Sequence, residues 1–418
     1  MRSMRSVTVE HKPELVSPAG DWSSLRSAVK GGADSVYFGV KGLNMRNTAD
    51  NFDLLELEKI MKFLHGEGLK GYLALNVIVF NKEIGRVEKI IHRAAESGVD
   101  AVILWDMAVM KAAVEAGLRV HLSTQASVSN FEALKFYASL GVKRIVLARE
   151  CTLEDIRNIL ALINKEKIDC QVETFIHGAM CVSISGRCFL SQQTFSKSAN
   201  RGECLQPCRR EFEIIDTDKD LRYVLGRDYV LSPKDLCTVD IIDDLITSGI
   251  HAFKIEGRVR SPEYVGEVTS VYREAIDSFF EGTLDKGKKA ELTKRLKGVY
   301  NRGFSTGFYP GDPENWISME LGAEYEKTYI GEVVKYYKQI GVAEIFVRSG
   351  EIRTGQEVVI MGKNTPAQMM KIEEMQKDHV PVTSACSGEP VGIKIDFAVK
   401  PKDKVFIWGK KMSSRNFP

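Results

Sequence analysis

The segment GYLALNVIVFNKEIGRVEKIIHRAAESGVDAVILWD (71–106) decides the fold, because it contains two β-rich apolar runs with a helical pattern between them. The helical stretch, residues 87–98, ends in glycine, as many helices do at their C-terminus. A strand, a helix and a second strand in this order predict two neighbouring parallel strands.

The same unit recurs along the first 260 residues. The β-rich runs lie at 13–20, 33–40, 71–79, 100–106, 119–127, 144–150, 170–178 and 252–258. Eight strands alternating with helices predict an α/β fold of the (β/α)8, TIM-like barrel type. The alternative is an open doubly wound sheet, which the lack of a glycine-rich dinucleotide fingerprint after the first strand disfavours.

The alternation is interrupted once, where residues 179–251 separate the last two β-rich runs. Long segments after barrel strands usually build or cover the active site. Beyond residue 320 the pattern changes to short β runs with turn residues, which predict a small antiparallel barrel. We therefore expect a catalytic domain at 1–320, with a Cys-rich insertion, and an accessory β-barrel domain at 321–418.

Composition narrows the class of protein. The net charge is only +2, so no global field indicates a nucleic-acid partner, although a local basic patch would suffice. No apolar run reaches the roughly 18 residues of a membrane span. The first 15 residues include basic residues without an apolar segment after them, which is not a secretory signal. We expect a cytoplasmic protein, in which clustered cysteines serve metal binding or catalysis more often than disulfides.

Half of the cysteines lie in two short motifs, HGAMCVSISGRCFLS (177–191) and GECLQPC (202–208). Thiolates are soft ligands that suit zinc or iron–sulfur clusters, and the lack of a C-x2-C pair disfavours common zinc sites. Three ligands could come from the two motifs of the insertion and a fourth from SPKDLCTVD (232–240). The second motif contains a fifth candidate thiol. In that order the candidates are Cys181, Cys188, Cys204, Cys237 and Cys208.

The main alternative is a nucleophilic cysteine. His177 stands four residues before Cys181 and could serve as its base, but one catalytic thiol does not explain five cysteines. His177 is also compatible with a polar residue at a strand end.

The motif ETFIHGAMCVSISGRCFLS (173–191) resembles the signature of peptidase family U32, the "collagenase-like" proteins. Other segments across nearly the whole chain also resemble that family; among them are residues 17–39, 123–150, 232–240 and 253–265. The two-domain length resembles the branch that hydroxylates the wobble uridine of tRNA to 5-hydroxyuridine. Branches that hydroxylate ribosomal-RNA cytidine or a ubiquinone precursor resemble it less.

The resemblance implies a 4Fe-4S cluster on four cysteines, which by position are Cys181, Cys188, Cys204 and Cys237. Cys208 resembles a cysteine of the tRNA branch that the rest of the family does not share throughout. The resemblance further implies tRNA as partner and prephenate, a dicarboxylate, as hydroxyl donor.

Charged and polar residues follow the predicted strands, where barrel enzymes build their sites. Arginine suits bidentate binding of a carboxylate. The alternative is an internal charge network of Lys254, Glu256 and Arg258. The catalytic candidates are Glu173, His177, Lys254 and Glu256, and the substrate-binding candidates are Asn76, Gln125, Arg149 and Arg258.

Local basic segments support an RNA partner. They are residues 208–210 with Arg187, Lys197 and Arg201, and the run at 286–302. Basic patches bind phosphates and aromatic residues stack on unpaired bases, although such runs are more often solvated helix faces. Two further interpretations stay open: a peptidase, despite the lack of G-x-S-x-G and H-E-x-x-H motifs, and a non-catalytic cluster carrier or RNA-binding protein.

Overall fold

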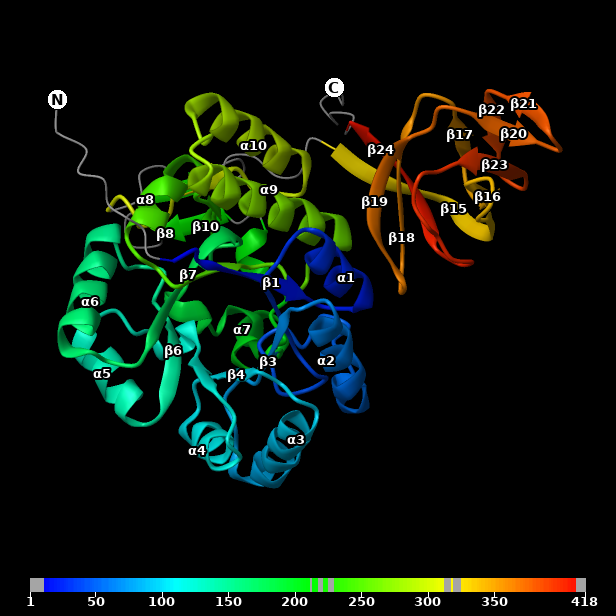
Figure 1. Ribbon diagram of the computed structural model, residues 1–418. Coiled ribbons are helices and arrows are strands. Elements are labelled where there is room, and N and C mark those ends of the chain that lie inside the picture. Colours follow the sequence, from blue (N-terminus) through cyan, green and yellow to red (C-terminus); the bar gives the residue numbers. More distant parts are fainter. Residues whose placement is uncertain are drawn as a thin grey trace.

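The computed structural model describes residues 11–210, 213–216, 221–224, 229–311, 317–318 and 325–410. Within these residues, eight parallel strands close into a barrel, in which β12 pairs with both β7 and β1. The strands are β1 (Glu14–Ala19), β2 (Ser35–Phe38), β3 (Lys70–Ala74), β4 (Ala101–Leu104), β5 (Val120–Leu122), β6 (Val142–Val146), β7 (Gln171–Gly178) and β12 (Ala252–Ile255). The predicted TIM-like barrel is confirmed (Figure 1).

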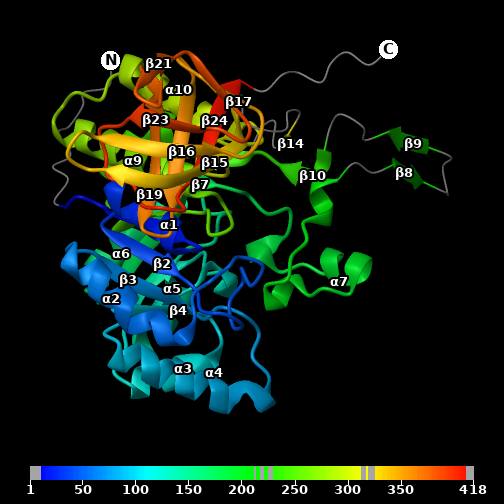
Figure 2. The same cartoon turned by 90° about the vertical axis from the view of Figure 1, so that its right-hand side faces the viewer.

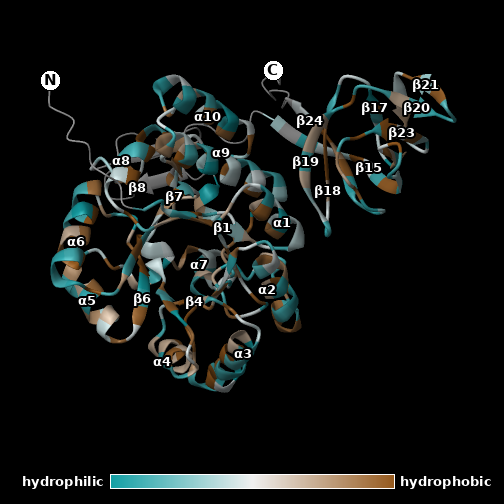
Figure 3. Cartoon of the chain, viewed as in Figure 1, coloured by the Kyte–Doolittle hydropathy of each residue, from teal (hydrophilic) through white to brown (hydrophobic). Residues whose placement is uncertain are grey.

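Helices surround the barrel, and several begin at residues whose side chains accept hydrogen bonds from the first turn. Asp21, Asp106, Asn130 and Thr152 do so for α1, α4, α5 and α6. Hydropathy alternates along these helices, as expected when one face packs on the strands (Figure 3). The helices are α1 (Trp22–Lys30), α2 (Leu57–Gly66), α3 (Ile84–Glu96), α4 (Met107–Glu115), α5 (Phe131–Ser139), α6 (Leu153–Glu166), α8 (Ile242–Thr247), α9 (Pro262–Phe280) and α10 (Lys286–Gly298).

The interior of the barrel holds a buried charge network. Lys254 Nζ lies 2.6 Å from Glu173 Oε1, and Arg144 contacts the other oxygen of Glu173 at 3.3 Å. Arg144 also binds Glu14 at 2.9 Å, and Tyr72 donates a hydrogen bond to Glu14. Lys254 therefore belongs to an internal charge network, which is the alternative that the sequence left open. Its carboxylate partner is Glu173 rather than Glu256.

The insertion between β7 and β12 projects from one end of the barrel (Figure 2). Its last strand returns to the barrel, where β11 pairs antiparallel with β7 and parallel with β13 (Phe304–Ser305). Its elements are η4 (Ile184–Gly186), α7 (Leu190–Phe195), η5 (Ala199–Arg201), η6 (Pro207–Arg209), β8 (Glu213–Asp216), β9 (Leu221–Val224), β10 (Tyr229–Pro233) and β11 (Asp235–Cys237).

The C-terminal region forms a separate antiparallel sheet with its own hydrophobic core, which includes Ile330, Ile345 and Val358. The predicted boundary at residue 320 lies outside the described residues, so the division at 320/321 stays a prediction. In spatial order the strands are β19 (Thr365–Lys371), β18 (Glu357–Gly362), β24 (Lys404–Lys410), β15 (Tyr325–Tyr337), β16 (Val342–Val347), β23 (Pro390–Lys394), β20 (Met375–Lys377) and β21 (Val380–Val382), beside a pair of β17 (Glu351–Arg353) and β22 (Ser384–Cys386).

This sheet rests on the barrel near α1 and α9. The backbone N–H of Ala367 donates to Ser27 Oγ of α1 at 3.1 Å, and Lys327 pairs with Glu263 of α9 at 2.8 Å. Among the described residues, no helix combines the length and apolar character that a membrane crossing requires. The first ten residues, part of the segment examined for a secretory signal, lie outside the described residues.

Candidate functional site

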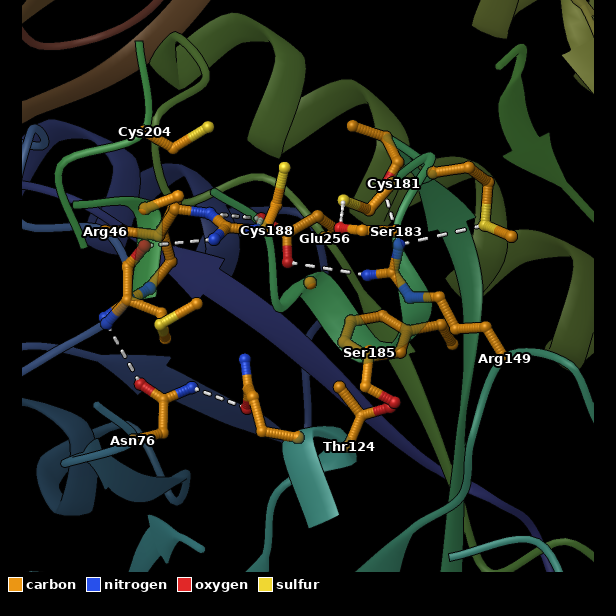
Figure 4. Close-up of a pocket in the computed structure, with 18 of the residues that line it drawn as sticks. Arg46, Asn76, Thr124, Arg149, Cys181, Ser183, Ser185, Cys188, Cys204 and Glu256 are labelled. Carbon is orange, nitrogen blue, oxygen red and sulfur yellow. Dashed lines mark hydrogen bonds and ion pairs between the residues drawn. The ribbon is translucent and has the colours of Figure 1, made fainter. Parts of the chain in front are cut away.

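A pocket of about 360 Å³ opens at the C-terminal ends of the barrel strands. Its walls come from the loops after β2, β3, β6 and β12 on one side and from the insertion on the other. This is the end at which TIM-type barrels build their active sites. Figure 4 shows the pocket with the cysteines of the insertion above a cluster of charged side chains.

Four cysteines of the insertion line this pocket: Cys181, Cys188, Cys204 and Cys208. Cys181 is exposed and its Sγ lies 3.0 Å from Ser183 Oγ, whereas the other three are half-buried. Burial raises the pKa of Cys208 to about 11; Arg209 opposes this shift, and charge on the other three thiols adds to it. The sulfur of Cys208 therefore lies within electrostatic range of the other three.

Cys237 lies apart from this group. It ends β11, opposite His177 of β7, and is only 7% exposed. The hydroxyl of Tyr272, which donates to the carbonyl of Ile176 at 2.9 Å, lies 3.8 Å from the sulfur of Cys237, and burial raises the pKa of this thiol to about 11. Cys237 does not line the pocket, so the structure groups Cys208, the fifth candidate from the sequence, with the other three.

The four thiols that line the pocket are soft donors, the type of ligand that iron–sulfur clusters take. Among the described residues, no group of three or more His, Cys, Asp or Glu side chains is arranged to hold one metal ion. A four-iron cluster takes one thiolate on each iron, so its ligands are spread around a larger object. Four soft donors around one pocket provide the donor set that such a cluster needs.

Three arginines surround Glu256 beneath the cysteines. Arg46 and Arg149 approach its two oxygens from opposite sides at 3.0 and 3.8 Å (Figure 4). Burial alone would raise the pKa of Glu256, but Arg46, Arg149 and Arg258 outweigh it and hold the pKa below its ordinary value. Three guanidinium groups beside one carboxylate leave an excess of positive charge in the pocket.

Arg258 has an unused donor. Its Nη2 donates to Asn44 Oδ1 at 2.9 Å, while its buried Nη1 has no hydrogen-bond partner. The side chain is only 3% exposed, and burial lowers the pKa of its guanidinium to about 10. Gly39 leaves the space for it, since a Cβ there would lie 2.5 Å from Nη1. An anionic ligand would satisfy this donor.

The predicted substrate-binding residues Asn76, Gln125, Arg149 and Arg258 all line the pocket. Asn76 accepts a hydrogen bond from the backbone N–H of Met45 and donates to Gln125 Oε1. Sequence reasoning missed Arg46, because it lies in the irregular loop after β2 rather than at a strand end. The sequence feature that could have identified Arg46 is a cationic residue in the loop after a barrel strand, because barrel enzymes build their active sites from these loops.

The four predicted catalytic residues fall in different places. Glu256 and Lys254 line the pocket, and Glu173 lies beneath it, fully buried against Lys254. His177 is buried, with Nδ1 3.3 Å from the hydroxyl of Tyr272. Burial, assisted by the charge of Arg260, lowers the pKa of His177 to about 3. A catalytic role for these residues stays a prediction, and His177 does not face the thiols through the pocket.

Comparison with known proteins places these features in a family. The sequence profile of peptidase family U32 matches residues 20–318. A protein of Porphyromonas gingivalis named collagenase is 39% identical over 95% of this chain and 98% of its own length. An uncharacterized protease of Methanocaldococcus jannaschii is 42% identical over 94% of this chain and 98% of its own. The tRNA hydroxylation protein P1 of Bacillus subtilis is 34% identical over 85% of this chain and 84% of its own.

Proposed function

The chain belongs to peptidase family U32, and from this premise we propose that it is an RNA-modifying enzyme that hydroxylates tRNA. The observation that carries the proposal is the similarity to a tRNA hydroxylation protein over most of both chains. We further propose that the product is 5-hydroxyuridine at the wobble position and that the reaction does not use molecular oxygen. A tRNA substrate would also put the protein in the cytoplasm.

A 4Fe-4S cluster is the proposed cofactor, held by Cys181, Cys188, Cys204 and Cys208. The support is that these thiols line one pocket, whereas Cys237 packs against Tyr272. When bound, such a cluster supplies one-electron chemistry whose potential depends on hydrogen bonds and solvent exposure. The protein contributes a half-buried wall that limits the access of water to three of its ligands.

The proposed co-substrate is a dicarboxylate, and specifically prephenate. Two carboxylates match the excess positive charge that Arg46, Arg149 and Arg258 leave around Glu256. Arg258, which is 3% exposed and lines the pocket, supplies a guanidinium group that is already desolvated. Glu256 holds Arg46 and Arg149 in place, and Asn76 and Gln125 offer amide groups to a base edge.

Replacing Arg258 with glutamine tests this assignment. In a strain that lacks the gene, 5-hydroxyuridine in tRNA should disappear, and the wild-type gene should restore it. Arg258→Gln should lower the initial rate of formation about tenfold to a hundredfold, because a hydrogen bond to a charged group contributes about 1.5–3 kcal/mol. Quantitative mass spectrometry of tRNA nucleosides measures the effect.

The control is Arg157→Gln, which removes a half-exposed arginine on α6 outside the pocket. It should behave like the wild type. Normal 5-hydroxyuridine in the deletion strain would contradict the proposed tRNA substrate. A changed ribosomal-RNA cytidine or quinone pool would point instead to another branch of the family. No change in any of them would favour a non-catalytic cluster carrier.

The relatives named collagenase and protease favour a peptidase as the second candidate. The site offers it little support, because no histidine lines the pocket among the described residues. His177, the nearest candidate base for Cys181 in sequence, is buried and has a pKa of about 3. Hydrolysis of collagen peptides by purified protein, together with unchanged tRNA nucleosides in the deletion strain, would favour this candidate.

A further inference from the structure

Four pairs of an arginine and an aromatic ring lie in segments that flank the residues lining the pocket, and Arg260 of one pair lines it directly. Most members lie in loops after the C-terminal ends of barrel strands or in the insertion. The distances from the guanidinium carbon to the ring centre are 5.0 Å for Arg201 and Phe80, 5.9 Å for Arg187 and Trp105, 4.5 Å for Arg210 and Phe195, and 4.1 Å for Arg260 and Tyr300. Cations are thus paired with aromatic faces in segments next to the pocket.

Exposed apolar side chains lie at the rim of the same pocket. Phe189 is 69% exposed although its neighbours Cys188 and Leu190 line the pocket. Ile184 and Val259 are also exposed, and both line the opening. Exposed apolar residues gathered around a pocket mark a binding surface, since a protein gains nothing by leaving them in water.

We infer that this rim is a docking surface for single-stranded RNA, on which Phe189 and Phe80 stack the bases beside the target nucleotide. The inference rests on the proposed function and specifies how its RNA is held. The positive charge of the rim favours RNA as its ligand, because Arg187 and Arg210 are exposed beside the aromatic rings and suit phosphates. The acidic groups nearby are partly engaged, since Glu83 pairs with Arg201.

The shape of the site favours an unpaired loop over a duplex. The charged groups lie in a pocket at the barrel end, which a base reaches only after leaving its stack. Flanking bases then lose their stacking partners, and aromatic side chains at the rim replace them. Stacking on an aromatic side chain contributes about 1–3 kcal/mol per base, so removing one ring should have a measurable effect.

The test is the affinity of the full-length holoprotein for an RNA stem-loop with an unpaired uridine, measured by fluorescence anisotropy. Phe189→Ala should raise the Kd about tenfold, which is the loss of one stacked base. Phe80→Ala, outside the cysteine motifs, should act in the same direction, and Phe189→Trp should retain the affinity. A fully paired duplex of the same length should bind more weakly to the wild type and respond little to the variants.

Phe136→Ala is the matched control, because Phe136 is 60% exposed on α5, away from the pocket. It should leave the Kd unchanged. Wild-type affinity in both Phe189→Ala and Phe80→Ala would overturn the inference, leave tRNA hydroxylation standing and point to a protein partner for the rim. Equal binding of loop and duplex would also overturn it. Absence of RNA binding by the wild type, with normal nucleosides in the deletion strain, would remove the proposed function itself.

Discussion

Serine in place of Cys208 should remove most of the iron and visible absorbance from protein purified without oxygen, whereas serine in place of Cys237 should leave both. Cys208 shares the pocket with Cys181, Cys188 and Cys204, and its thiol interacts electrostatically with all three. Cys237 is buried among apolar side chains, where its sulfur lies 3.8 Å from the hydroxyl of Tyr272. Serine oxygen is a harder donor than thiolate and binds iron–sulfur clusters less well.

The measurement is iron and acid-labile sulfide per chain, with the absorbance near roughly 400 nm that such clusters show. Cys386→Ser is the control, since Cys386 is exposed on β22 in the C-terminal sheet. Circular dichroism shows whether each variant is folded, so that a lost ligand is distinguished from a lost fold. The reverse result, with iron kept by Cys208→Ser and lost by Cys237→Ser, would return the fourth position to Cys237. Colourless, folded wild-type protein would contradict the cluster.

The fold could be predicted from the sequence because the apolar residues follow clear strand-like and helix-like patterns. Each of the eight apolar runs overlaps one barrel strand, and glycines mark the ends of intervening helices such as α2 and α3. The substrate-binding candidates were found for a related reason: in a parallel barrel, polar residues at the C-terminal ends of strands converge on one mouth. Asn76, Gln125, Arg149 and Arg258 do so.

The rest of the site depends on the path of irregular segments, which periodicity does not encode. β11 returns antiparallel to β7, and this turns the sulfur of Cys237 toward Tyr272 of α9 rather than toward the pocket. Arg46 enters from a loop without helix or strand pattern, and Phe189 reaches the rim at the start of the short helix α7. Spacing along the chain identified five candidate thiols but could not show which four of them share one pocket.

Glu173→Gln should lower the free energy of unfolding by about 3–5 kcal/mol, the usual cost of leaving buried charges without their partner. Glu173 is fully buried between two cations, with Lys254 Nζ at 2.6 Å and Arg144 Nη1 at 3.3 Å. Arg144 keeps Glu14 as a second partner, but no other acidic group forms a salt bridge with Lys254 within the described part of the chain. Glutamine preserves the shape, removes the charge and replaces one of the two acceptor oxygens with an NH2 group that cannot accept from Lys254 or Arg144.

Urea unfolding of the variant, followed by circular dichroism, measures this cost, and a second substitution identifies its origin. Glu173→Gln with Lys254→Met should be more stable than Glu173→Gln alone, because the orphaned cation is then absent. Glu166→Gln, which breaks the exposed surface pair with Lys135, should leave the stability almost unchanged, because solvent screens such pairs. The sequence predicts a catalytic role for Glu173, whereas the structure pairs it with Lys254 and Arg144, and this comparison separates the two roles. If the Glu173→Gln variant is as stable as the wild type but does not hydroxylate tRNA, Glu173 is catalytic. If the variant loses much of its stability and Lys254→Met restores part of it, Glu173 belongs to the charge network beneath the pocket.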